Sequence, residues 1–219
     1  MEEIRMNEYD ILPEELFFLG TLLQAKYIDY AYIAAMDDIQ DNFSLKKKET
    51  IAGLVKKGFI QEDFSGDLEV GTELRSLLEP VFFGVKETSL DICHLIDNKH
   101  VDIYKFHHRN GNITLVSGKD RMLVVRAIDD EYFSELLSSV LEKESDDFVD
   151  AITELDYSKI TKLIAVKSSI VGGSSFVNTY FEVDNHLYIE RETGELCSVS
   201  KEDFIHEAMK VLRGVSSGI

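Results

Sequence analysis

Histidine is the residue type in this sequence whose spacing first suggests chemistry. The chain has six histidines, and four of them, His94, His100, His107 and His108, lie within a stretch of 15 residues. Imidazole nitrogens are common ligands of zinc and other transition metals. Adjacent residues of a regular strand point to opposite faces, however, so His107 and His108 cannot both bind one ion. The pattern therefore predicts ordinary strand and turn histidines, with no metal and no other cofactor.

The other reactive residue types form no catalytic pattern. Cys93 and Cys197 lie far apart without a Cys-x-x-Cys spacing, which predicts buried, reduced thiols. The run Gly172-Gly173-Ser174-Ser175 lacks the lysine and the strand-to-helix context of a phosphate-binding loop, so it is typical of a flexible connection. The 41 aspartates and glutamates show no motif spacing, and the sequence has no nucleophile elbow or dinucleotide fingerprint. We therefore expect that the protein is not an enzyme.

The charge excludes further classes of protein. With 23 basic and 41 acidic side chains among 219 residues, the formal net charge is −18, which opposes binding to nucleic-acid backbones and to anionic membranes. DNA binding is favoured only at Lys46–Lys48 together with Lys56 and Lys57, where acidic neighbours dilute the basic charge. The start of the chain is too acidic for a signal peptide, and no apolar stretch is long enough to span a membrane. These features predict a soluble, cytoplasmic protein with no membrane insertion.

The first 85 residues show helical periodicity. Pro13 is suited to a first helical turn, and the leucines that follow it share one face, namely Leu16, Leu19, Leu22 and Leu23. Three more helices are expected: around Tyr27–Ile33, over Lys46–Lys57 with Ile51, Leu54 and Val55 inward and Gly58 as the stop, and from Gly71 to the residue before Pro80. The segment LVKKGFI (Leu54–Ile60), followed by a polar turn and another helix, is typical of a winged-helix element.

Alternation and tight turns replace the helical pattern after Pro80. Val101 to Phe106 alternate, Asn110-Gly111 is a strong hairpin signal, and Ser117–Asp120 is expected as a second turn. Further strands are expected at Ile113–Leu115, Met122–Ile128, Thr161–Ser168, Phe176–Val183, His186–Arg191 and Leu196–Val199. Helices are expected after Phe133 and after Ser200, the second with Ser200 as its N-cap. Glu142–Asp156 is expected as a short solvated helix or linker with Phe148, Val149 and Ile152 inward.

The order of strands followed by a helix occurs twice. Phe133, Val140 and Leu141 of the first helix match Phe204, Val211 and Leu212 of the last, each 71 residues later. We interpret the match as two halves related by a pseudo-two-fold axis; the alternative is two unrelated strand meanders, each closed by a helix. The prediction is an α+β fold with a central antiparallel sheet and flanking helices. Its parts are a winged-helix-like region (1–85), a first meander with its helix (86–145), and a linker, second meander and C-terminal helix (146–219), in one compact unit.

Taken in order, these segments resemble a known family. The segment Glu14–Leu23, the helix ending in Leu54–Ile60, the leucine-rich helix ending at Pro80, and the turn Thr193-Gly194 before the last strand and helix carry the resemblance. They resemble the EspG-like chaperones of type VII (ESX) secretion, and in size the EsaE-like branch, from about Leu12 to Leu212. The landmarks are hydrophobic, glycine and proline positions and not chemical motifs.

The resemblance implies a cytosolic, non-enzymatic chaperone with a central antiparallel sheet and quasi-two-fold symmetry. It also implies that a helical secreted substrate, ESX- or LXG-like, is held soluble and delivered to the secretion ATPase. Mapped by order, the partner-binding elements are the hairpin loop His108–Asn112, the loop Ser168–Ser175 and the helix Lys201–Leu212. The residues assigned to partner binding are His108, Arg109, Asn110, Gly111, Asn112, Gly172, Gly173, Phe176, Phe204 and Met209.

Two other functions remain open from the sequence. One is a winged-helix DNA-binding regulator, which the basic residues near Lys46 favour. The other is an adaptor or toxin-neutralising protein, which shares every feature of the chaperone interpretation and differs only in its partner.

Overall fold

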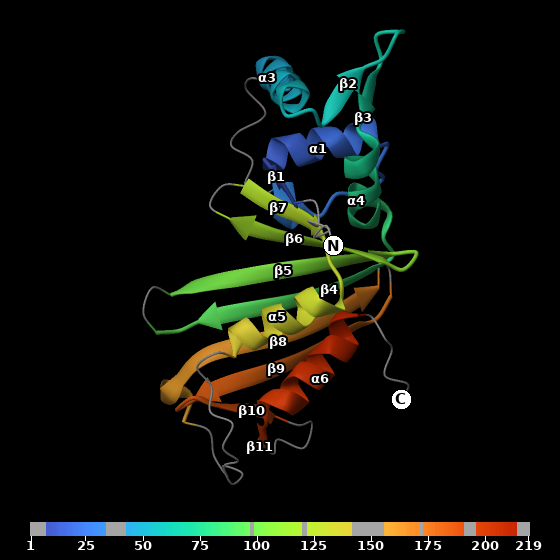
Figure 1. Cartoon of the computed structure of the whole chain (residues 1–219). Helices are drawn as coiled ribbons and strands as arrows, with labels where there is room; N and C mark the ends of the chain where they lie inside the picture. The colour runs from blue at the N-terminus through green and yellow to red at the C-terminus, as the bar shows by residue number, and fades with distance from the viewer. Residues whose placement is uncertain are drawn as a thin grey trace, which may run out of the picture. The chain divides into compact units, whose positions relative to one another are not determined.

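The computed structural model describes residues 8–33, 43–96, 99–119, 122–141, 156–170, 173–190 and 196–213. Contacts within the chain divide it into two units. Unit 1 comprises residues 1–85 and 107–127, and unit 2 comprises residues 86–106 and 128–219 (Figure 1). Antiparallel strands pack with helices, so the predicted α+β class is confirmed. Within the described part of the chain, every helix is too short or too polar to pass through a bilayer.

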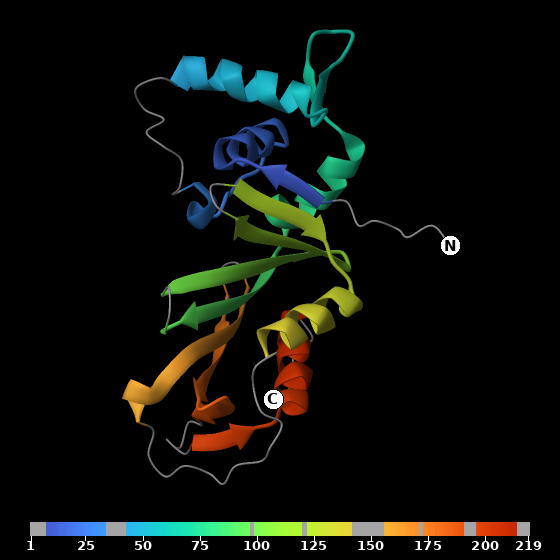
Figure 2. The same ribbon diagram turned by 60° about the vertical axis from the view of Figure 1, so that its left-hand side comes forward.

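Unit 1 contains three adjacent strands in the order β1-β7-β6, with helices packed against them. Figure 2 shows α1 lying over β1. The core is formed by Ile11, Leu16, Leu19, Leu78 and Val125, whose side chains are all fully buried. The elements of this unit are β1 (Glu8–Ile11), α1 (Pro13–Leu22), α2 (Tyr30–Ile33), α3 (Phe43–Lys56), β2 (Ile60–Glu62), β3 (Leu68–Val70), α4 (Thr72–Phe83), β6 (Asn112–Lys119) and β7 (Met122–Ala127).

The start of α1 holds a buried carboxylate that is paired with a lysine. Glu15 is 3% exposed. Its Oε2 accepts from the Leu12 backbone N–H at 2.9 Å and lies 2.6 Å from the Lys57 Nζ at the end of the next long helix. A buried carboxylate is costly unless it is paired and hydrogen-bonded. Glu15 therefore fixes α1 against the end of α3, and the charge of Lys57 is paired with Glu15.

The segment α3-β2-β3-α4 has the helix, hairpin and helix order of a winged-helix element. Gly58 ends α3 with a φ of +72°, in agreement with its predicted role as a stop. Leu54 is fully buried as predicted, but Val55 is 49% exposed. The inward prediction for Val55 was wrong because only a narrow stripe of α3, through Leu54, packs on the neighbouring helix.

Helix α4 continues through Pro80 and does not end before it. Proline removes one helical hydrogen bond and costs roughly 3 kcal/mol in a helix interior. Here Leu78 on one side and Phe82 on the other are both buried in the core of unit 1. The Gly84 N–H donates to the Pro80 carbonyl at 2.9 Å, so the last turn is closed. Tertiary burial on both sides of the proline therefore outweighs its local cost.

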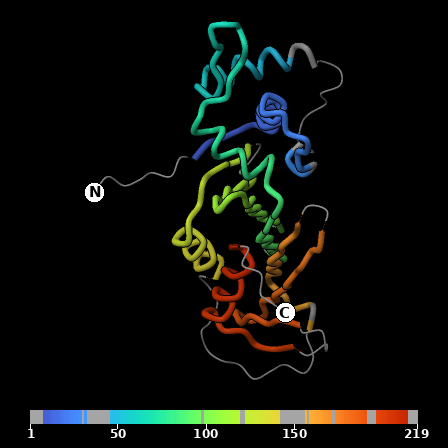
Figure 3. The backbone as a smooth tube through the Cα atoms, turned by 90° about the vertical axis from the view of Figure 1, so that its right-hand side faces the viewer, coloured from blue at the N-terminus to red at the C-terminus, as the bar shows by residue number. Residues whose placement is uncertain are grey.

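Unit 2 is a curved antiparallel sheet with two helices on one face. Its strands follow the order β5-β4-β8-β9-β10-β11, and Figure 3 shows α5 and α6 side by side. Phe133 of α5 packs on Phe106 with ring centroids 4.9 Å apart, and Phe204 of α6 packs edge-on against Tyr180 at 4.8 Å. The elements are β4 (Lys86–His94), β5 (His100–Arg109, whose last three residues belong to unit 1), α5 (Asp130–Val140), a short 3-10 turn (Tyr157–Lys159), β8 (Ile160–Ile170), β9 (Ser175–Val183), β10 (His186–Glu190), β11 (Leu196–Val199) and α6 (Lys201–Leu212).

The repeat seen in the sequence corresponds to a repeat of elements. Four strands and a helix, β4 to α5, are followed by four strands and a helix, β8 to α6. Within unit 2 the first strands of the two sets, β4 and β8, pair antiparallel, with Leu90 opposite Val166 and Ile92 opposite Ile164. The helix N-caps are also 71 residues apart: Asp129 accepts from the Tyr132 N–H, and Ser200 accepts from the Asp203 N–H. Residues 71 apart in the sequence therefore occupy equivalent positions in α5 and α6.

Several local predictions need correction. Residues 117–119, predicted as a turn, continue β6 because they pair with β7, with Ser117 opposite Val124. Strands β1 and β4 were not predicted, although β4 is central to unit 2. The predicted linker Glu142–Asp156, with Phe148, Val149 and Ile152, lies outside the described residues except for Asp156, as does the turn Thr193-Gly194.

We expect Phe204→Ala to lower the free energy of unfolding of the chain by about 3–5 kcal/mol, because it leaves a cavity under α6. Phe204 is fully buried against Tyr180. The measurement is urea unfolding followed by far-UV circular dichroism. His206→Ala, on the exposed side of the same helix, is the control and should change stability by less than about 0.5 kcal/mol. Equal effects of the two substitutions would contradict the packing described here.

Candidate partner-binding surface

The sheet of unit 2 has two unlike faces. Along its central strands the even-numbered residues point towards α5 and α6; they include Leu90, Ile92, Phe106, Ile164, Val166 and Tyr180, all buried. Successive strand residues alternate in direction, so odd-numbered residues point away from both helices. On that side Val101 is 54%, Ile103 45% and Val177 51% exposed. We call the odd-numbered side of β4, β5, β8 and β9 the open face.

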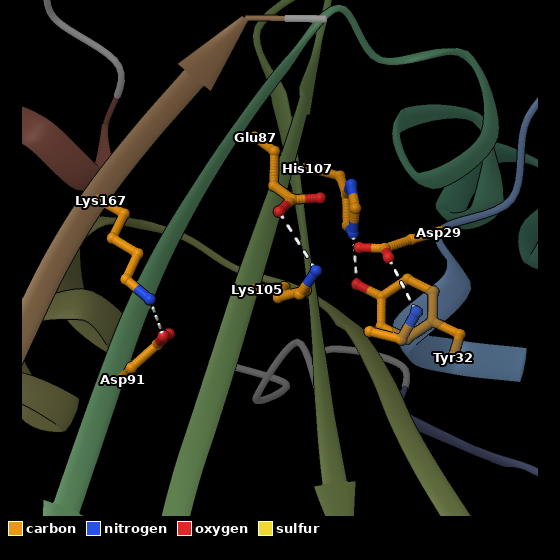
Figure 4. Close-up of polar contacts among 8 residues, drawn as sticks. Asp29, Tyr32, Glu87, Asp91, Lys105, His107 and Lys167 are labelled. Carbon is orange, nitrogen blue, oxygen red and sulfur yellow. Dashed lines mark hydrogen bonds and ion pairs between the residues drawn. The ribbon is translucent and has the colours of Figure 1, made fainter. Parts of the chain in front are cut away.

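Two lysine–carboxylate pairs lie at the centre of the open face (Figure 4). Lys105 Nζ lies 3.3 Å from Glu87 Oε1 between β5 and β4, and Lys167 on β8 is paired with Asp91 on β4. The second oxygen of Asp91, Oδ1, is buried and has no hydrogen-bond partner among the described residues. The pairs balance charge on the strands and leave the apolar side chains of β5 and β9 on either side of a polar centre.

The end of the β8–β9 hairpin exposes apolar side chains on both faces. Ile170 is 49% and Phe176 46% exposed on the helix side, and Val177 is 51% exposed on the open side. We call these three residues the β8–β9 tip. The Gly173 N–H donates to the Ile170 carbonyl at 2.9 Å, which closes the connection. Adjacent exposed apolar side chains of this kind are typical of protein–protein contact surfaces.

The sequence-predicted residues of this loop fall at the tip. Phe176 is part of it, and Gly173 lies beside Ile170, where an added Cβ would come within 3.2 Å of the Ile170 Cβ. Gly172 lies outside the described residues.

The predicted hairpin loop His108–Asn112 belongs to unit 1 and is a tight turn. Asn110 and Gly111 both have positive φ, +51° and +82°, as two-residue hairpins require. Arg109 does not extend freely into solvent: its Nη1 donates to the Phe83 carbonyl, and its guanidinium lies 5.5 Å from the Phe83 ring centroid. His108 is half-buried, while Asn110, Gly111 and Asn112 are exposed. Arg109 therefore holds the end of α4, and the turn residues are those available to a partner.

The two residues assigned on the last helix have different environments. Phe204 is fully buried under α6, so its side chain supports the helix and offers no contact area. Met209 is half-buried.

His107 is accounted for within unit 1. It is 6% exposed, and its Nε2 lies 2.6 Å from the Tyr32 hydroxyl oxygen, a hydrogen-bond distance (Figure 4). Adjacent His108 points to the opposite side of β5. The structure thus separates this pair, but it brings together His94, His100 and Asp102 at one end of the unit 2 sheet.

A cavity of about 340 Å³ lies on the helix side of the unit 2 sheet, lined by residues that include Tyr104, Lys162 and Glu182. Lys162 Nζ lies 2.6 Å from Glu182 Oε2 and donates to the Val140 carbonyl at 3.1 Å. Burial first, and then the nearby Asp102 carboxylate, raises the pKa of Tyr104. Tyr104 therefore stays protonated near neutral pH and cannot act as a base there.

The basic residues that favoured DNA binding are placed beside acidic ones. The β2–β3 hairpin next to α3 carries Glu62, Asp63, Asp67 and Glu69, and Lys57 is paired with Glu15. Hydrogen bonds from Ser65 and the Asp67 backbone N–H lower the pKa of Asp63, which keeps it charged. A hairpin of this charge repels a phosphate backbone.

Comparison with known proteins finds similarity of three-dimensional structure but no similarity of sequence. The type VII secretion system chaperone EspG5 of Mycobacterium tuberculosis, solved in complex with the PE25-PPE41 dimer, superposes with a TM-score of 0.61 at 8% sequence identity. The superposition covers 94% of this chain and 95% of that chain. This chain shares its fold with EspG5. No family model matches the sequence, and no curated protein matches it.

The structural match to EspG5 and the resemblance seen in the sequence point to the same kind of protein. A type VII secretion chaperone is a structural neighbour, and the match covers 94% of this chain. At this identity the match establishes the fold alone. Fold similarity by itself does not determine function, so the assignment of activity has to rest on the surfaces as well.

The sequence did not single out the exposed apolar residues of the open face. Val101 and Ile103 alternate with Tyr104 and Phe106, so β5 carries apolar side chains on both faces. That pattern was the available signal, because a strand with one solvated face normally alternates with polar residues. The pattern did not show which face of β5 the helix α5 would cover.

We expect Arg109→Ala to lower the free energy of unfolding by about 1–3 kcal/mol, because a charged hydrogen bond to the Phe83 carbonyl is lost. The measurement is urea unfolding, with Asn112→Ala in the same hairpin as the matched control. Asn112 is exposed, so its replacement should have little effect. A stability loss confined to Asn112→Ala would overturn the structural role given to Arg109.

Proposed function

We propose that this chain is a cytoplasmic, non-enzymatic chaperone or adaptor that binds a helical protein secreted by a type VII (ESX) system and keeps it soluble. The observation that carries the proposal is the similarity of fold, over 94% of this chain, to EspG5, a type VII secretion chaperone solved with a bound PE25-PPE41 dimer. By the same analogy, the complex would be delivered to the secretion ATPase at the membrane.

The surfaces of unit 2 support a protein partner of this kind. The β8–β9 tip exposes Ile170, Phe176 and Val177, and the open face adds Val101 and Ile103. Exposed apolar side chains that surround paired charges suit the apolar stripe of an amphipathic helix, with polar contacts at the rim. The net charge of −18 favours a partner whose flanking residues are basic. We assign the β8–β9 tip as the primary contact.

We expect a secreted helical protein to co-purify with the tagged chain from its native cells in stoichiometric amount. Phe176→Asp should reduce recovery of that partner at least about tenfold, because a charge replaces an apolar anchor at the contact. The measurement is affinity capture with quantitative mass spectrometry, together with export of the same partner in cells that lack the chain.

The matched control is Phe64→Asp, the same substitution at a fully exposed phenylalanine on the β2–β3 hairpin of unit 1. It should leave recovery unchanged. Loss of the partner in Phe64→Asp but not in Phe176→Asp would remove the β8–β9 tip from the proposal. Unchanged export of every secreted protein in cells lacking the chain would contradict the chaperone function itself.

A further inference from the structure

Three metal-ligating side chains meet at the β4–β5 end of unit 2. His94 is the last residue of β4, His100 is the first of β5, and Asp102 follows two residues later on the same side of the strand. One ligand atom from each residue lies within 4.8 Å of the other two. His94 Nε2 is 3.3 Å and His100 Nε2 is 3.4 Å from the same oxygen, Asp102 Oδ2.

We propose that His94, His100 and Asp102 form a binding site for a divalent transition metal ion, with zinc as the preferred occupant. These two distances match the separation between neighbouring ligands of a tetrahedral zinc ion. Bonds of about 2.0–2.1 Å place two such ligands about 3.3 Å apart. The separation of each imidazole nitrogen from the shared carboxylate oxygen therefore already suits a common ion.

The orientation of the imidazole rings defines the movement that binding of an ion requires. The rings of His94 and His100 are stacked, 4.2 Å between centroids and 10° apart in plane, with both Nε2 atoms near the carboxylate. The lone pair of an imidazole nitrogen lies in the ring plane, so two parallel rings direct their lone pairs side by side. One ring therefore turns about its Cβ–Cγ bond when both nitrogens bind the same ion, and the Asp102 carboxylate balances part of the charge of that ion.

The donor set selects the class of ion. Two imidazole nitrogens and one carboxylate oxygen suit zinc, nickel, copper or cobalt, whereas calcium and magnesium prefer sets made of oxygen. The side chains of His94, His100 and Asp102 are 30%, 51% and 42% exposed, so an ion can reach them from solvent. His94 and Asp102 also line the 340 Å³ cavity, which leaves room for a water molecule as a further ligand.

A bound ion would connect the end of β4 to the start of β5. It would stabilise unit 2 because binding to the folded state alone shifts the unfolding equilibrium. This site is independent of the partner-binding proposal, since it lies on residues that the β8–β9 tip does not include.

The test uses the full chain without a histidine tag, treated with EDTA and then dialysed. We expect zinc chloride to bind with one-to-one stoichiometry in isothermal titration calorimetry and to raise the melting temperature. Cobalt(II) should give visible absorption typical of a tetrahedral site. His100→Gln and Asp102→Asn should each weaken zinc binding at least about tenfold, because a three-ligand site loses one donor, and should abolish the thermal shift.

The matched control is His206→Gln, which removes an exposed histidine on α6 and should bind zinc as the original chain does. The circular dichroism spectrum of each metal-free variant checks its fold. Zinc binding that is equally strong in His100→Gln and Asp102→Asn would overturn the proposal. So would an original chain that shows no heat of zinc binding and no cobalt absorption at equimolar metal in a micromolar protein solution.

Discussion

The antiparallel pairing of β4 with β8 is the interaction on which the rest of unit 2 depends. It runs from Lys86 opposite Ile170 to His94 opposite Lys162. The pairing places Leu90, Ile92, Ile164 and Val166 on one side, where their burial under the helices supplies the hydrophobic free energy of the unit. Thr88 on the same side donates to the Leu212 carbonyl at 3.0 Å and ties the end of α6 to β4.

The same pairing creates the surface that the proposed function uses. Because side chains alternate along a strand, covering one side of β4 and β8 with helices leaves the other side without them. Lys167 and Asp91 face each other there across the two central strands. Strand β8 ends at the tip, where Ile170 and Phe176 are exposed. The packing of the core and the exposure of the contact surface are thus two consequences of one register.

Several features of local structure were predicted correctly from the sequence. Asn110-Gly111 is a hairpin turn with positive φ, and Ser200 caps α6 through the Asp203 N–H. The 71-residue offset between the helices also corresponds to equivalent positions, with Phe133 and Phe204 both fully buried. These features depend on residues close in sequence or on a periodicity, so they can be recognised without knowing what packs against them.

Tertiary structure decided the rest. Pro80 lies inside α4 because Leu78 and Phe82 are buried on either side of it. Val101 is exposed while Phe106 is buried, although both are apolar residues of one strand. His94, His100 and Asp102 meet because β4 and β5 bring them to one end of the sheet, whereas the adjacent pair His107-His108 is separated by the pleat. The sequence by itself determined the Asn110-Gly111 turn, the Ser200 cap and the buried positions Phe133 and Phe204, since these follow from local backbone preference and periodicity. Which face is covered, and which side chains from different elements meet, followed only from strand pairing and packing, because those free energies arise between segments distant in the chain.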